Sequence, residues 1–170
     1  MEEKMVSQFR IFVVLTSIVV TVSVLIFWFI EVQNRHRDNL QLAQIHLDHG
    51  VQLHVQKKYQ LAKKKLIQAT RADPKSWKAF FYLGAGNFEL KRYDAAIPFL
   101  ERALFLAPTE QKIYKMLGVI YYKLGQLDMA RGYFTSYFEL DLNNKDARGM
   151  IEMIAKLQRS TALAATKEIN

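Results

Sequence analysis

A glycine followed twelve positions later by an alanine recurs three times in this chain, at a spacing of 34 residues. The pairs are Gly50 with Ala62, Gly84 with Ala96, and Gly118 with Ala130. A fixed period of this size is typical of a stacked array of helical repeats. Such arrays usually present extended surfaces that hold other proteins. The period therefore predicts a binding protein more than a catalyst.

The composition excludes several kinds of chemistry. The 170 residues include no cysteine, so disulfides, thiolate catalysis and cysteine-rich zinc sites are absent. The formal net charge of +8 favours acidic partners or anionic surfaces without specifying one.

Residues 11–30 form an uninterrupted run without a charged side chain. As a helix this run would be about 30 Å long, close to the hydrocarbon thickness of a bilayer. Trp28, near its end, suits the headgroup boundary. A cleaved secretion signal is the alternative, but its apolar core would normally be shorter and small residues would follow. We expect a head at 1–10, a transmembrane helix at 11–30 and a helical juxtamembrane linker at 31–42.

Flanking charges do not decide the orientation of this span. Lys4 and Arg10 precede it, and Arg35 and Arg37 follow it, which is a tie under the positive-inside rule. The short head is similar to that of bacterial signal anchors. This similarity implies a bacterial inner-membrane protein whose repeats are exported to the periplasm.

The repeats are expected at 43–76, 77–110 and 111–144. Glycine in a helix costs about 1 kcal/mol relative to alanine, so close packing of the paired helices must offset it. The small residues Ala62, Ala96 and Ala130 are the expected partners of the glycines. Turns are predicted at Gly125 and at the Lys57-Lys58 and Lys91-Arg92 steps, with Pro74 and Pro108 ending second helices. Ser76 and Thr109 are expected to cap the helices that follow.

A lid for the stack is predicted at 145–159, followed by a frayed tail at 160–170. Apolar residues recur there at helical spacing: Ala147, Met150, Ile151, Ile154 and Leu157. Asn143 or Asn144 can cap this helix.

The third unit also contains the run Tyr114, Leu117, Gly118 and Tyr121. Together with the glycine and alanine positions, this run resembles the tetratricopeptide repeat family over about 100 residues, by a count along the period. Departures are Asn87 in place of a tyrosine, Leu142 in place of a proline, and His46 and His49 in the first unit. The resemblance implies an all-α protein, a right-handed superhelical stack of three helix–turn–helix repeats with a capping helix, preceded here by the transmembrane helix.

The resemblance also implies a concave groove lined by the first helix of each repeat. Carried over by offset, the groove residues that the resemblance implies are Leu47, Val51, His54, Lys78, Phe81, Ala85, Phe88, Lys112, Lys115, Val119 and Tyr122. Aromatic residues beside lysines suit a partner helix or extended segment with apolar anchors and acids. The alternative is that Phe81, Phe88 and Tyr122 only pack between neighbouring first helices. Leu47 and Val51 stand where some family members hold a C-terminal carboxylate, so that mode is not expected.

Catalytic motifs are missing from the sequence. It contains no glycine-rich phosphate loop and no nucleophile with a recognisable base. His46 and His49 are one turn apart, but no further ligands complete a metal site. We therefore expect no enzyme, no cofactor, no metal and no small-molecule substrate.

Three functions fit these features. The first is a membrane-anchored scaffold that binds a protein or peptide in the groove. The second is a periplasmic assembly or chaperone factor in envelope or cytochrome biogenesis. The third is an RNA-binding helical-repeat protein, for which the scattered charge and the anchor are a poor fit, so no nucleic-acid partner is expected.

Overall fold

A computed structural model describes the backbone of residues 2–169 and the side chains of residues 16–161 and 163. The side chains of the predicted head, of the start of the predicted span and of most of the predicted tail lie outside the described residues. Within the described range the protein is all-α, with seven helices and no strand. The helices are α1 (Glu2–Val55), α2 (Tyr59–Ala72), α3 (Trp77–Glu89), α4 (Tyr93–Leu106), α5 (Gln111–Lys123), α6 (Leu127–Leu140) and α7 (Lys145–Ile169).

The chain divides into two compact units, residues 1–41 and residues 42–170. The first unit belongs to α1, and the last residues of α1 contribute to the second. In the described part of the chain, α1 is the one helix long and apolar enough to cross a membrane, and its most apolar 18-residue stretch has a mean hydropathy of 1.8. The side chains of residues 16–42 are exposed, and Phe27, for example, is 72% exposed. The linker predicted at 31–42 is helical.

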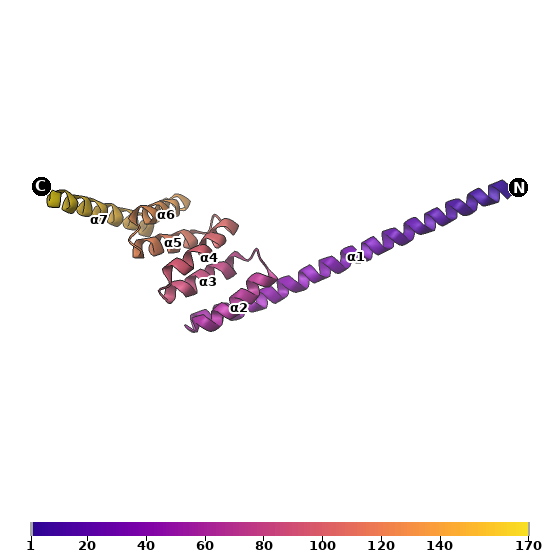
Figure 1. Cartoon of the computed structure of the whole chain (residues 1–170), viewed down its shortest axis with the longest axis horizontal. Helices are drawn as coiled ribbons and strands as arrows, with labels where there is room; N and C mark the ends of the chain where they lie inside the picture. The colour runs from indigo at the N-terminus through magenta and orange to yellow at the C-terminus, as the bar shows by residue number, and fades with distance from the viewer. Residues whose placement is uncertain (1, 170) are drawn as a thin grey trace. The chain divides into compact units, whose positions relative to one another are not determined.

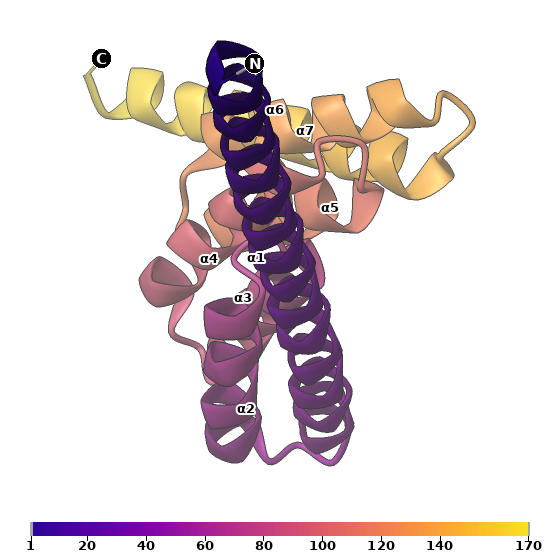
Figure 2. The same cartoon turned by 90° about the vertical axis from the view of Figure 1, so that its right-hand side faces the viewer.

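The second unit is a row of helices in which each neighbour along the chain is also a neighbour in space. The paired helices α3–α4 and α5–α6 lie side by side (Figure 1), and the view turned by 90° shows the same pairs (Figure 2). Contacts between α2 and α3, α4 and α5, and α6 and α7 continue the row. Each hairpin therefore covers the apolar side of the next, which is how repeat arrays bury a core.

The turns inside the three hairpins share one backbone motif, at the predicted positions. Lys57, Lys91 and Gly125 all have positive φ, at 59°, 57° and 74°. The amide that follows each of them donates to a carbonyl five residues back, as from Lys58 to Leu53 at 2.9 Å. This is the Schellman arrangement that ends many helices.

The three glycines of the period lie at helix contacts, as the sequence predicted. A β-carbon on Gly50 would lie 2.7 Å from Leu66, and one on Gly118 would lie 2.9 Å from Phe134. The partner residues differ from the prediction, because Leu66, Leu100 and Phe134 cover the glycines. Ala62, Ala96 and Ala130 are buried, and the Ala96 carbonyl oxygen would lie 3.3 Å from a β-carbon on Gly84, farther than the Leu100 side chain.

Two apolar clusters form the core. The larger runs through the second and third repeats into α7 and includes Leu100, Ile113, Leu117, Phe134 and Ile154. The smaller joins the first repeat to the second through Leu47, Leu66 and Leu83.

The predicted serine and threonine caps are wrong. Ser76 occupies the N-cap of α3 without a side-chain cap bond, and the N-cap of α5 is Glu110, not Thr109. Aspartates close the loops before α3 and α7. Asp73 accepts a bond from the Lys75 amide at 2.9 Å, and Asp141 accepts one from the Asn143 amide at 3.1 Å. The Asp73 bond holds the loop before α3, in which the Ser76 hydroxyl makes no cap bond.

Helix α7 closes the stack. Asn144 caps it by accepting a bond from the Ala147 amide at 3.0 Å, and Ala147 and Ile154 are fully buried. Leu157, expected on the buried side, is exposed. The helix also continues to Ile169, where the sequence predicted a frayed tail. Alanine and leucine, both strong helix formers, dominate the segment after Thr161 and account for the extension.

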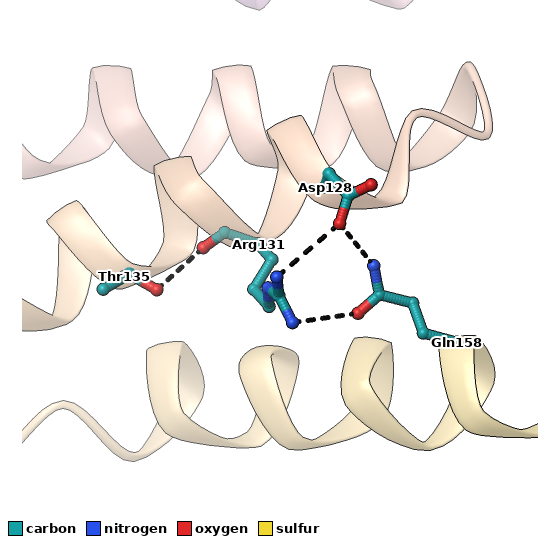
Figure 3. A network of polar contacts seen from close by, with 4 residues as sticks. All are labelled: Asp128, Arg131, Thr135 and Gln158. Carbon is teal, nitrogen blue, oxygen red and sulfur yellow. Dashed lines mark hydrogen bonds and ion pairs between the residues drawn. The ribbon is translucent and has the colours of Figure 1, made fainter.

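A polar network joins α7 to α6 (Figure 3). Gln158 donates to Asp128 at 2.8 Å and accepts a bond from Arg131 at 3.2 Å. Arg131 also pairs with Asp128 at 3.6 Å.

Candidate partner-binding groove

The predicted groove residues fall on the last part of α1 and on α3 and α5. The structure separates them into two groups. Leu47, Phe81 and Ala85 are buried, at 5%, 8% and 4% exposure. They pack in the core, so for Phe81 the structure favours the packing alternative. The other eight retain exposed surface, and together we call them the groove set: Val51, His54, Lys78, Phe88, Lys112, Lys115, Val119 and Tyr122.

His54 joins the first repeat to the second. Its ring lies edge-on to Tyr59 at 5.2 Å and to Tyr82 at 5.4 Å between ring centroids. Its Nδ1 atom is buried without a hydrogen-bond partner. Burial lowers the pKa of His54, and the negative charge of Glu89 partly opposes this shift. The imidazole therefore acts as a packed aromatic group.

Tyr59 and Glu89 belong to the same contact. Desolvation raises the pKa of the Tyr59 hydroxyl, and the charge of Glu89 and a hydrogen bond to it raise that pKa further.

In the third repeat, the rings of Tyr121 and Tyr133 stack with their centroids 5.3 Å apart. Burial is again the main cause that raises the pKa of both hydroxyls.

Lys112 connects the second repeat to the third through aromatic rings. Its ammonium group lies 4.5 Å from the Trp77 ring centroid and 5.3 Å from that of Phe81. Lys78, one period earlier, lies 5.8 Å from the same Trp77 ring. Both lysine side chains remain exposed. Cation–π contacts of this kind hold a lysine in place while leaving its charge accessible to a partner.

Lys115 connects the third repeat to α7. Its ammonium group pairs with Asp146 at 3.3 Å. Lys115 lines two adjoining clefts, and Asp146 lines the second of them. One cleft is lined by Glu110, Lys112 and Lys115, and the other by Lys115, Met150 and Met153. Lys112 also pairs with Glu110 at 3.7 Å.

Sequence reasoning missed Trp77, Asp146 and the methionines of α7. Trp77 is the first residue of its repeat, next to Lys78, so an aromatic ring preceding a groove lysine was an available signal. Asp146 and Met150 were assigned to a lid. The repeat spacing places Asp146 one period after Lys112, which could have extended the groove onto α7.

Aliphatic and aromatic side chains complete the groove set. Val51, Phe88, Val119 and Tyr122 are half-buried, and the Phe88 ring lies 5.7 Å from that of Tyr93. Among the described residues, no group of three or more metal-binding side chains comes together. The arrangement offers apolar surface and fixed ammonium groups, which suit binding.

The fold defines a class of protein: an array of paired helices stacked in chain order. Two sequence models of the tetratricopeptide repeat match the chain, at residues 55–111 and 87–154. Together they span residues 55–154, more than half of the chain. The protein belongs to the tetratricopeptide repeat family.

Solved structures share this fold. The first repeat domain of Spaghetti (RPAP3), bound to an HSP90 peptide, has a TM-score of 0.67 and 23% identity, covering 71% of this chain and 95% of that one. MamA has a TM-score of 0.66 and 22% identity, covering 72% and 74%. The Yersinia enterocolitica secretion chaperone SycD, bound to a peptide of the translocator YopD, has a TM-score of 0.63 and 20% identity, covering 68% and 93%. No curated protein matches the chain.

Proposed function

We propose that this protein is a single-pass membrane scaffold whose repeat domain docks a protein or peptide on the groove set. The observation that carries the proposal is the pair of lysines one period apart, Lys78 and Lys112, both placed beside the Trp77 ring with their charges exposed. A partner helix or extended segment with acids and apolar anchors complements such a surface.

Two solved relatives of the fold support this proposal. Spaghetti (RPAP3) is bound to an HSP90 peptide, and SycD is bound to a translocator peptide. In this chain Leu47 and Val51 offer no donor to a carboxylate in the first repeat. The lysines of the second and third repeats are the cations left for an acidic partner.

The anchor rests on the apolar part of α1. A helix of this length and hydropathy, with its side chains uncovered by protein, is stable when lipid surrounds it. The short head before the anchor predicts that the repeats are exported to the periplasm. Because the chain lacks cysteine, a Gln68→Cys variant would carry a single thiol. Labelling of this thiol in intact cells by a membrane-impermeant maleimide supports export, and protection until lysis contradicts it.

Charge neutralisation tests the docking function. The double variant Lys78→Gln with Lys112→Gln is purified with its partners from detergent-solubilised native membranes. We expect the amount of captured partner to fall about tenfold, the effect of about 1.4 kcal/mol.

The matched control is Lys58→Gln with Lys64→Gln, because both residues are exposed on another surface. This control should capture the partner as the parent does. An equal loss in both double variants would show a general effect of net charge, and no loss in the first would reject the groove.

A further inference from the structure

A cleft between α5, α6 and α7 has a glycine in its wall. It is lined by Lys115, Tyr137, Asp146, Gly149, Met150 and Met153, and we call it the Gly149 cleft. It adjoins the cleft at Lys112, because Lys115 and Tyr137 line both.

Gly149 stands one period after Lys115, and two and three periods after Phe81 and Leu47. At this position of the period, α1, α3 and α5 carry Leu47, Phe81 and Lys115, whereas α7 carries a glycine, which has no side chain. Gly149 lies inside α7, where glycine costs about 1 kcal/mol relative to alanine.

Packing within the chain does not account for this glycine. A β-carbon on Gly50, Gly84 or Gly118 would collide with a neighbouring helix, but one on Gly149 would meet nothing within 4 Å. The missing side chain therefore leaves space at the cleft that the protein itself does not fill.

The rest of the wall indicates what can enter. Met150 is half-buried and Met153 is 39% exposed, and methionine adapts its shape to apolar groups. Lys115 and Lys145 supply two positive charges against the single negative charge of Asp146. An apolar side chain next to a carboxylate fits this combination, with the carboxylate competing with Asp146 for Lys115.

We propose that the Gly149 cleft receives an apolar side chain of an acidic partner segment, whose neighbouring carboxylate binds Lys115. This inference rests on the proposed docking function and assigns one end of the partner to α7. Gly149 is the residue that keeps the cleft open.

Methionine methyl spectroscopy tests the cleft directly. The full chain, in detergent and labelled with ¹³C at its six methionine methyl groups, is titrated with an acetylated peptide of alternating Glu and Leu. A matched peptide of alternating Lys and Leu is the control probe. The Met150 and Met153 signals, assigned from Met150→Leu and Met153→Leu, should shift with the acidic peptide only.

Two glycine variants separate the cleft from the fold. Gly149→Leu should weaken binding of the acidic peptide at least about tenfold by filling the cleft. Gly132→Leu is the control, because Gly132 also lies inside a helix with nothing within 4 Å but does not line the cleft. It should leave binding unchanged. Asp146→Asn should strengthen binding, since it frees Lys115.

Other outcomes overturn the inference. Unshifted Met150 and Met153 signals, or unchanged binding by Gly149→Leu, would show that the cleft is not a subsite. If the Met150 and Met153 signals shift when the protein is diluted in the absence of peptide, a second copy of the chain occupies the Gly149 cleft instead. If Lys78→Gln with Lys112→Gln still reduces partner capture in these cases, the docking function stands and only the cleft is rejected.

Discussion

A β-carbon on Gly84 would lie 2.5 Å from Cγ of Leu100 and 3.3 Å from the carbonyl oxygen of Ala96. The first and second helices of this repeat are therefore in contact at a point where residue 84 has no side chain. The same kind of contact recurs in each repeat, between Gly50 and Leu66 and between Gly118 and Phe134, and it brings the two helices of each hairpin close together.

Gly84→Ala should destabilise the repeat domain by about 1–2 kcal/mol. Overpacking of a well-packed contact costs about 1–3 kcal/mol, and the better helix propensity of alanine returns part of this. Urea unfolding followed by circular dichroism measures the change. Gly132→Ala is the control and should be neutral or stabilising by up to about 1 kcal/mol, because its surroundings are open. Equal stability of both variants would mean that Gly84 is not a contact point.

The hairpin turns allow a prediction of the opposite sign. Lys57 and Lys91 adopt positive φ, which costs a residue with a β-carbon about 1–2 kcal/mol and costs glycine little. Lys91→Gly should therefore raise the free energy of unfolding by about 0.5–1 kcal/mol, because relief of the left-handed backbone, about 1–2 kcal/mol, exceeds the entropy that glycine adds to the unfolded chain. Gly125→Ala, at the same position of the next hairpin, should lower it by a similar amount. A loss of stability in Lys91→Gly would contradict the shared turn motif.

His54 should make stability depend on pH. Its pKa is lowered in the folded chain, whereas the unfolded chain takes up the proton near pH 6.5. Below that pH the unfolded state binds more protons, so the free energy of unfolding falls as the pH drops. Above it the two states do not differ at this group.

Urea unfolding at a series of pH values measures this effect. His54→Phe should remove the pH-dependent part, and Glu89→Gln should enlarge it, because Glu89 opposes the lowering of the His54 pKa. His49→Gln is the exposed control and should retain the parent's profile. A parent curve that stays flat down to pH 5 would refute the role assigned to His54.

Gln158 should hold the end of α7 locally. Its bonds to Asp128 and Arg131 join α7 to α6 on an exposed surface, so their loss changes global stability little (Figure 3). Gln158→Ala should speed amide hydrogen exchange in the part of α7 after residue 154. Arg159→Ala, at the adjacent exposed position, should not. Identical exchange in the two variants would assign no role to the network.

The repeat period could be predicted from the sequence. Gly50, Gly84 and Gly118 each destabilise a helix relative to alanine, and a close contact with a neighbouring helix offsets that cost. The turn at Gly125 followed from residue type. The covering side chain could not be predicted, since Ala96 and Leu100 are one turn apart on α4 and both face α3. The Ser76 cap failed where Asp73 holds the loop before α3, and the Thr109 cap failed because α5 begins one residue later, with Glu110 at the N-cap. The groove was predicted as a row, but the burial of Phe81 depends on how closely neighbouring repeats pack.

Site-specific photocrosslinking in native membranes tests the docking surface most directly. A benzophenone amino acid replaces Tyr122 of the groove set in one variant and Phe105, an exposed aromatic residue of α4, in the other. Tyr122 should give a discrete covalent adduct with a partner protein, and that adduct should disappear when Lys78→Gln and Lys112→Gln are added. An adduct from Phe105 but none from Tyr122 would contradict docking in the groove.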